Sequence, residues 1–296
     1  MYGIRQITPP AFEPVSLALA KQHLIVASAD TYDDNLISAY IQAARDYAER
    51  YTQSVLIEQT LQLTLDHFPW RTASNGTSHS FTPAYAELAP LYDTYAIRGM
   101  QINLPRSPLI TVESITYLAD DSVTVLTIPA DQYIVDTSTA PGRIMPIPGA
   151  IWPYQLNYVP GSVQVTFTAG YSRSFTEALT VAENAAQLSL QSTSTPVVSY
   201  TTAGTALTLV MSSPAQGEYL YANGVITVNI ADNGVSLTVT YRTPNVPLTI
   251  QQAMLLMIGS WYQTREGVSA LNIKNVPLGV DALLSTNRNF IITLGN

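Results

Sequence analysis

The stretch that decides the fold is Val163-Gln164-Val165-Thr166-Phe167-Thr168-Ala169-Gly170-Tyr171, a strand pattern that should lead into the helix beginning near Pro247. Between them lies an insertion, at residues 172–245, where the composition changes abruptly to Ser- and Thr-rich alternating strands. The residues on either side have the patterns of one compact unit. We therefore expect an α+β fold: a helical bundle with a small antiparallel β unit, formed by residues 1–171 and 246–296, plus an inserted all-β subdomain at 172–245.

Three helices are predicted in the main part. Ser16 can cap a short first helix, and Asp33 and Asp34 open a second one near the positive end of its dipole. The apolar stripe of the second helix is Leu36, Ile37, Tyr40, Ile41, Ala44, Tyr47, Ala48 and Tyr51. The helical period returns after Pro247 and should end at Gly267, and residues 276–284 can form one or two further turns.

The main part also carries strand patterns. Leu61, Leu63 and Leu65 alternate with polar residues, as in a half-buried strand. Further strands are predicted at residues 101–104, 110–118, 123–128 and 133–135, with a hairpin turn at 120–122. Residues 1–14 are expected to form a non-helical arm, and residues 70–98 a long surface loop.

The insertion has the pattern of a small β subdomain with five or six strands. Apolar residues alternate with Ser and Thr along 207–211 and 235–241. Asn223-Gly224 stands at a strand end, and Asp232-Asn233-Gly234 lies between two β runs, which is a strong hairpin signal. A flexible or glycosylated Ser/Thr stalk is the alternative, but a stalk does not need strict alternation.

Composition excludes several functional classes. Of the 296 residues 47% are hydrophobic, enough for a real core, while only 11% are charged, and the only lysines are Lys21 and Lys274. The net charge of −8, with no cationic run, argues against tight binding of nucleic acid. There is no cysteine for disulfides or a thiolate zinc site. We expect neither an export signal nor a membrane span, since the longest apolar run, 253–258, is far short of about 20 residues.

No motif indicates catalysis. The histidines His23, His67 and His79 lack metal-ligand spacing, and the carboxylate pairs 33–34 and 120–121 are explained by a helix start and a turn. A nucleophile elbow, a phosphate-binding glycine loop and a dinucleotide fingerprint are all missing from the sequence. We expect a protein that is not an enzyme and has no catalytic residue, metal site or cofactor.

Several segments, taken in order, resemble the head–tail connector family of tailed bacteriophages, also called adaptor or head-completion proteins. The segments are 13–24 (EPVSLALAKQHL), 33–37 (DDNLI), 43–52 (AARDYAERYT), 104–109 (LPRSPL), 112–117, 167–171 (FTAGY), 252–266 with Trp261-Tyr262 and Arg265-Glu266, Gly279-Val280 and Leu283-Leu284. Together they cover about residues 13–171 and 246–290. The insertion departs from the family pattern.

The resemblance implies a structural virion protein at the neck, on the portal vertex, assembled in the host bacterial cytoplasm. It implies a cyclic homo-oligomer, usually of twelve copies, that joins the portal protein to the tail or to the next neck protein. Genomic DNA would pass through the lumen without specific binding, which suits an acidic chain.

Two sets of residues are candidates for the contacts of such a ring. The apolar C-terminal tail is expected to dock on the portal or on a neighbouring subunit through Val280, Leu283, Leu284, Arg288 and Phe290. Candidate inter-subunit residues are Tyr40, Tyr47, Tyr51, Trp261 and Arg265. For the aromatic residues, an ordinary role in the helix core is the preferred interpretation.

A different function remains open. The inserted subdomain could make the chain a virion binding module, such as an adhesin or a receptor- or glycan-binding protein. Tyr219 and Tyr221 permit this interpretation without requiring it.

Overall fold

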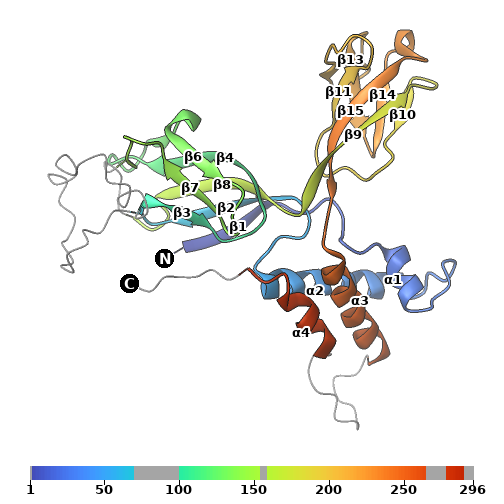
Figure 1. The fold of residues 1–296 in the computed structure, drawn as a ribbon, viewed down its shortest axis with the longest axis horizontal. Helices are drawn as coiled ribbons and strands as arrows, with labels where there is room; N and C mark the ends of the chain where they lie inside the picture. The colour runs from blue at the N-terminus through green and yellow to red at the C-terminus, as the bar shows by residue number, and fades with distance from the viewer. Residues whose placement is uncertain (1, 70–99, 154–158, 265–277, 290–296) are drawn as a thin grey trace. The chain divides into compact units, whose positions relative to one another are not determined.

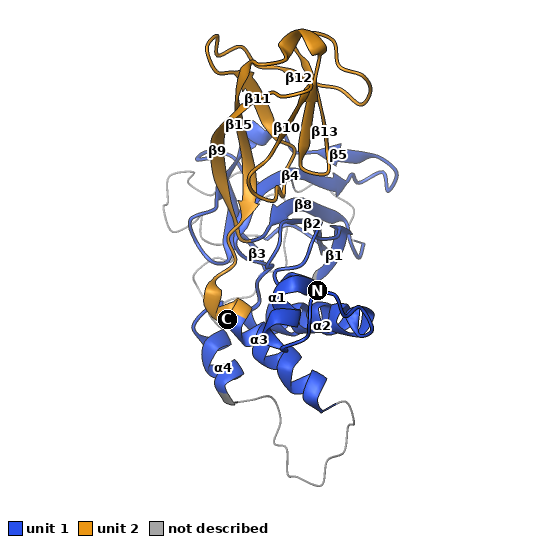
Figure 2. Cartoon of the chain, turned by 90° about the vertical axis from the view of Figure 1, so that its right-hand side faces the viewer, with its two compact units in different colours: residues 1–170, 252–296 blue, residues 171–251 orange. Residues whose placement is uncertain are grey.

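The computed structural model describes residues 2–69, 100–153, 159–264 and 278–289 (Figure 1). The fold is mixed, with four α-helices and several mainly antiparallel sheets in the described residues. The chain divides into two compact units, residues 1–170 with 252–296 and residues 171–251 (Figure 2). We call them unit 1 and unit 2. The predicted loop at 70–98 lies outside the described residues.

The helices form where the periodicity of the sequence predicts them. They are α1 Leu17–His23, α2 Asp34–Thr52, α3 Leu248–Gln263 and α4 Leu278–Ser285. The Ser16 hydroxyl accepts a hydrogen bond of 3.2 Å from the Leu19 N–H, which confirms the predicted cap of α1. None of the described helices is both long and apolar enough to cross a lipid bilayer.

Helix α2 buries a narrower stripe than predicted. Its buried residues are Ile37, Ile41, Ala44, Ala48 and Thr52. Tyr40, Tyr47 and Tyr51 are only half-buried, since they stand at the margins of this stripe. The helix ends at Gln53, whose left-handed backbone (φ 56°) turns the chain toward the sheets.

The described part of unit 1 contains two sheets. A five-stranded antiparallel sheet has the order β1-β2-β8-β4-β5, and a three-stranded antiparallel sheet has the order β3-β7-β6. The strands are β1 Tyr2–Thr8, β2 Gln59–Leu65, β3 Ile102–Leu104, β4 Leu109–Leu118, β5 Val125–Thr127, β6 Tyr133–Asp136, β7 Gly142–Pro146 and β8 Val163–Ala169. The predicted non-helical arm thus contains a strand, and the turn at 120–122 joins β4 to β5 as predicted.

The two sheets of unit 1 share one core. Buried residues of the larger sheet, such as Leu63, Val165 and Phe167, belong to the same cluster as Leu104 and Ile144 of the smaller one. Phe68 stacks on Trp152 within it, with ring centroids 5.1 Å apart, and the indole N–H of Trp152 donates to the Met100 carbonyl at 2.6 Å. The sheets are therefore one packed body.

Unit 2 is built from two further sheets, with the orders β11-β15-β9 and β10-β14-β13-β12. Its seven described strands, more than the predicted five or six, are β9 Ser172–Thr180, β10 Ala185–Gln187, β11 Val197–Tyr200, β12 Thr208–Leu209, β13 Glu218–Ala222, β14 Val225–Val228 and β15 Ser236–Pro244. All pairs are antiparallel except β12 with β13. Side chains of both sheets, including Val198, Val239, Ile226 and Val228, form a single core. The arrangement is a small two-sheet sandwich.

Only one of the two turn signals in unit 2 marks a hairpin. Asn223 and Gly224 have φ of 51° and 80°, as a type I′ turn requires, and they join the paired strands β13 and β14. The hairpin predicted at Asp232-Asn233-Gly234 is wrong. That segment follows a 3-10 turn, Ile230–Asp232, and connects β14 to β15, which belong to different sheets. A local turn motif does not determine which strand becomes the partner.

Candidate docking surfaces

The predicted docking tail coincides largely with α4. Val280 and Leu284 are fully buried inside the chain, and Leu283 is half-buried. A Cβ on Gly279 would lie 3.9 Å from Leu256 Cδ1, which places the start of α4 close to α3. The two buried side chains therefore hold α4 in unit 1, and an exposed docking contact would have to use other atoms of this helix. Phe290 lies outside the described residues.

Arg288 contacts one of the aromatic candidates, Tyr51, directly. Its guanidinium lies 5.5 Å from the centre of the Tyr51 ring, which in turn stacks on Tyr47 with centroids 6.2 Å apart. The Asn289 N–H donates to the Thr52 carbonyl at 2.9 Å and ties the end of this segment to α2. Burial raises the pKa of Tyr47, and the Asp281 carboxylate adds to the effect. Arg288, which was predicted to dock on the portal, thus lies beside Tyr51 and near Tyr47, which were predicted for contacts between subunits.

The other aromatic pair joins α2 to α3. The rings of Tyr40 and Trp261 are 6.1 Å apart and inclined at 56°. This contact agrees with the helix-core interpretation, although both side chains remain half-exposed. Arg265 lies outside the described residues. The inter-subunit and docking roles of these residues stay predictions.

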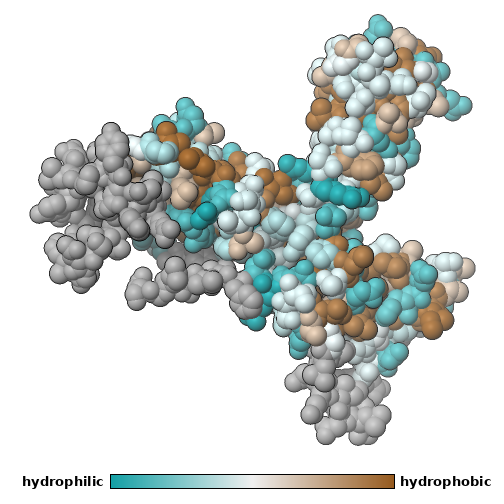
Figure 3. Space-filling view, viewed as in Figure 1, coloured by the Kyte–Doolittle hydropathy of each residue, from teal (hydrophilic) through white to brown (hydrophobic). Residues whose placement is uncertain are grey.

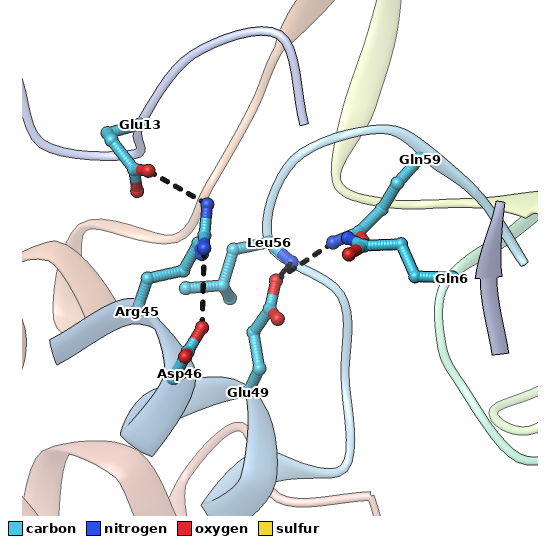
Figure 4. A network of polar contacts seen from close by, with 7 residues as sticks. All are labelled: Gln6, Glu13, Arg45, Asp46, Glu49, Leu56 and Gln59. Atoms are coloured by element: carbon cyan, nitrogen blue, oxygen red, sulfur yellow. Dashed lines mark hydrogen bonds and ion pairs between the residues drawn. The ribbon is translucent and has the colours of Figure 1, made fainter. Parts of the chain in front are cut away.

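A polar network that the sequence did not reveal links the N-terminal arm, α2 and the start of β2 (Figure 4). Arg45 lies 2.8 Å from Glu13 and 3.3 Å from Asp46. On the next turn, Glu49 Oε1 accepts hydrogen bonds from the Leu56 N–H at 2.9 Å and from Gln59 Nε2 at 3.3 Å.

Burial dominates the electrostatics of this network. It raises the pKa of the Glu49 carboxyl, although the Leu56 N–H and the nearby Arg45 and Arg106 act in the opposite direction. Burial also raises the pKa of Glu13, against the attraction of Arg45. The network lies where the helices meet the sheets, because Arg106 Nη1 donates to the Glu49 carbonyl at 3.2 Å and Val55 N–H to the Ser107 carbonyl at 2.8 Å.

The loop between α1 and α2 is held from inside by a lysine. The side chain of Lys21 is 6% exposed, and its ammonium lies 2.8 Å from Asp34 Oδ1 and 3.2 Å from the Ser28 carbonyl, with the Asp30 carbonyl as a further acceptor. The loop presents Ile25, which is 93% exposed and has a left-handed backbone (φ 59°), and Tyr32, which is 90% exposed. The scarcity of lysine in the sequence was the only signal for this site.

Apolar side chains are also exposed on the five-stranded sheet. They stand on β1 (Ile4 and Ile7) and on the β4–β5 hairpin (Val123, Val125 and Leu126). Figure 3 shows hydrophobic residues at the surface of the helices as well as of the sheets. Several surfaces of the chain are thus suited to contact with other proteins.

The described residues contain no cluster of three or more His, Asp or Glu side chains that could hold a metal ion. His23 is exposed, His67 Nδ1 lies 2.8 Å from the Phe68 carbonyl, and His79 lies outside the described residues. The carboxylate pairs have structural partners: Asp34 binds Lys21, and Asp121 accepts hydrogen bonds from the Val123 and Thr124 N–H groups.

Comparisons with known proteins give a fold and no sequence family. No protein-family model matches the chain, and no curated protein matches it. The solved structure titled "Neck of empty GTA particle computed with C6 symmetry" contains a similar chain, with a TM-score of 0.55 and 17% identity over 99% of this chain and 98% of that one. A chain from "Neck of native GTA particle computed with C12 symmetry" matches over the same shares, with a TM-score of 0.52 and 16% identity.

A third similar chain comes from "Virion of native gene transfer agent (GTA) particle", again over 99% and 98% of the two chains, with a TM-score of 0.52 and 17% identity. All three likenesses include both units, because they span nearly the full length. The expected resemblance to head–tail connectors is therefore confirmed at the level of the fold, and the chain has the fold of a component of the neck of phage-like particles.

Proposed function

We propose that this chain is a structural virion protein that forms a ring, of twelve copies, between the portal and the tail and provides part of the DNA conduit. The observation that carries the proposal is the match of the whole chain to components of gene transfer agent necks, two of them computed with C6 and C12 symmetry. The ordered connector-like segments of the sequence support it independently.

Within this function, unit 1 is the adaptor core, a helical bundle with its antiparallel β unit, and residues 172–245 are an inserted β subdomain. The division of the chain at residues 170 and 252 supports this organisation. The insertion closes on itself, because the Asn245 N–H donates to the Tyr171 carbonyl at 3.0 Å. Its ends therefore lie side by side, as an insertion into a continuous fold requires.

Assembly into a closed ring needs two different surfaces on each copy, one for each neighbour. The exposed apolar residues of unit 1 stand on separate elements, the loop after α1, strand β1 and the β4–β5 hairpin. Arg288 and the exposed side of α4 are proposed for the portal, and Tyr40 and Trp261, with rings half-exposed, for a neighbouring copy. These surfaces make a non-enzymatic, assembling protein the best-supported function.

The net charge of −8 suits a conduit through which DNA slides, since like charges repel the phosphates. Rings should therefore retain duplex DNA only weakly, even at low ionic strength. Filter binding at rising salt measures this property, and tight, salt-sensitive retention would contradict the conduit role.

The alternative, a binding module acting through unit 2, gains no support from its two tyrosines. Tyr219 is only 4% exposed, and its hydroxyl donates to the Pro196 carbonyl inside the core of the sandwich. It cannot form an aromatic platform for a glycan together with Tyr221.

Electron microscopy of the purified chain, alone and mixed with the portal protein of its own source, tests the proposal. We expect twelve-fold rings seated on the portal. Particles that remain monomeric and ignore the portal would contradict both the ring and the neck location.

A further inference from the structure

The five-stranded sheet of unit 1 ends in two edges without partners among the described residues. Strand β1 pairs only with β2, and β5 pairs only with β4. Figure 2 shows β5, β4, β8, β2 and β1 following one another across the sheet, with β1 and β5 outermost. An unpaired edge strand presents a row of backbone donors and acceptors to any chain that can pair with it.

The buried face of this sheet continues to both edges. Three successive pairs cross the sheet along this face: Ile4↔Leu63, Leu63↔Val165 and Val165↔Ile115. Two residues after Ile115 on β4, Tyr117 pairs with Leu126 of β5. Paired residues point to the same face of a sheet, and so do residues two apart along a strand. Ile4 and Leu126 therefore belong to the face that carries the core. Leu63, Val165 and Ile115 are buried and Tyr117 is half-buried, whereas Ile4 is 36% and Leu126 41% exposed.

The two edges also differ in charge. Strand β1 contains Arg5 and no acidic residue, whereas the β4–β5 hairpin contains Asp120 and Asp121 and no basic residue. Asp121 fixes the hairpin by accepting hydrogen bonds from the Thr124 hydroxyl and from the Thr124 and Val123 N–H groups, and these bonds lower its pKa. The edges thus differ in charge and are alike in having an uncovered apolar residue.

Strand direction determines how copies can join. Each of the five strands is antiparallel to its neighbours, so β1 and β5, four positions apart in the sheet, run in the same direction. A cyclic operation that brings β5 of one copy beside β1 of the next therefore pairs them in parallel. Strand β5, Val125–Thr127, is about 10 Å long at about 3.3 Å per residue, so it can match three residues of the regular part of β1, residues 2–6.

We infer that neighbouring copies in the ring join edge to edge, β5 and its hairpin on one copy pairing with β1 of the next, so that Leu126 packs against Ile4. This inference rests on the proposed ring. The partner is a second copy of this chain because the two edges are different, lie at opposite ends of one sheet and each leave an apolar residue of the core face uncovered, as a head-to-tail contact requires. A two-fold dimer would pair β1 with β1 and leave β5 open.

Cysteine cross-linking tests the pairing without background, because the chain contains no cysteine. The variant Ile4→Cys/Leu126→Cys carries one thiol on each edge. The matched control, Ile4→Cys/Ile134→Cys, moves the second thiol to β6, an edge strand of the other sheet whose Ile134 is 44% exposed. Both are assembled, then oxidised or treated with a short bis-maleimide that tolerates a one-residue shift of register, and separated on denaturing gels.

We expect a ladder of linked subunits from the first variant, ending in a closed species, and monomer from the control. Rings that form but give no ladder would overturn the edge pairing and leave the proposed function intact. A covalent dimer from Ile4→Cys alone would overturn it in favour of β1–β1 pairing. Absence of rings from the unmodified chain together with its portal would contradict the proposed function itself.

A charge substitution gives a second test that does not depend on thiol geometry. Leu126→Lys should leave the circular dichroism and the unfolding midpoint nearly unchanged, since the side chain is exposed, but reduce ring assembly at least tenfold. Ile134→Lys is the control and should assemble normally. Normal assembly of folded Leu126→Lys would refute the inference.

Discussion

The Tyr262 hydroxyl donates a 2.6 Å hydrogen bond to the Asp33 carboxylate across 229 positions of sequence. Asp33 occupies the N-cap position of α2, yet its side chain makes no cap hydrogen bond. The carboxylate instead ties α3, which follows the insertion, to the helix that precedes it. This contact shows that the segments on either side of unit 2 form one body.

Removal of that hydroxyl should weaken unit 1. Tyr262→Phe is expected to lower the free energy of unfolding by about 1.5 kcal/mol, the usual range for a hydrogen bond to a charged group. Urea unfolding measures the change. Tyr32→Phe, at a tyrosine that is 90% exposed, is the matched control and should be neutral. Equal stability of the two variants would show that the contact contributes nothing.

Lys21 should be the most sensitive charged residue of the helices. Lys21→Met removes the cation from three acceptors and leaves the Asp34 carboxylate without it, so we expect a loss of about 3 kcal/mol. Limited proteolysis should become faster within residues 24–33. Arg50→Met, at an exposed position of α2, is the control. Unchanged proteolysis of Lys21→Met would contradict the role of the lysine in holding the loop.

The stability of the chain should depend on pH through Glu49. Because burial raises its pKa, the folded state binds more protons than the unfolded state between the two pKa values. Ionisation of Glu49 therefore opposes folding. The stability that goes with its raised pKa is fully present below the unfolded-state pKa and is lost as pH rises through the folded-state pKa. Relative to the unmodified chain, Glu49→Gln should gain stability as pH rises above the ordinary carboxyl pKa.

Asp136 provides a control of opposite sign. Hydrogen bonds from Ser138 and Arg143 lower the pKa of Asp136 to about 2, so its contribution is present above the ordinary carboxyl range and lost as pH falls. Asp136→Asn should therefore be less stable than the unmodified chain above the ordinary carboxyl range, and this difference should disappear as pH falls. Parallel pH profiles for the two variants would refute the assignment of both shifts.

Gly170 is the position that leads from β8 to unit 2. Its φ is 146°, and a Cβ would lie 2.6 Å from both the N and the Cα of Glu58. Gly170→Ala should cost about 3 kcal/mol or more, because both the backbone and a rigid neighbour resist the side chain. Gly204→Ala, with φ of 65° and open space, isolates the backbone part and should cost about 1 kcal/mol. Thermal unfolding distinguishes the two, and similar losses would exclude the clash.

Arg288 should affect the portal contact more than the fold. Arg288→Glu removes the contact with the Tyr51 ring, which contributes about 1 kcal/mol at an exposed site, and reverses the charge beside the proposed docking tail. We expect rings to form normally but to bind the portal at least tenfold more weakly in sedimentation assays. Arg50→Glu on α2 is the control for charge. Equal portal binding by both variants would show that the tail is not part of the portal-binding surface.

Most helices and strands could be predicted from the sequence because their signals are local. The Ser16 cap, the 3.6-residue period of α2 and the alternation at 61–65 depend only on neighbouring residues. The order of the connector-like segments likewise indicated the fold. The network of Glu13, Arg45 and Glu49 could not be predicted, since its members come from separate elements.

Pairing and burial were decided by the tertiary structure. Asp232-Asn233-Gly234 has the composition of a hairpin, but the shared core of the sandwich draws β14 and β15 into different sheets. Val280 and Leu284 have the apolarity of a docking tail, but α4 buries them against its own chain. The sequence by itself determined where elements form, because backbone preference and periodicity are local. Only the tertiary structure decided which surfaces remain open, because burial depends on all residues that compete for the same core.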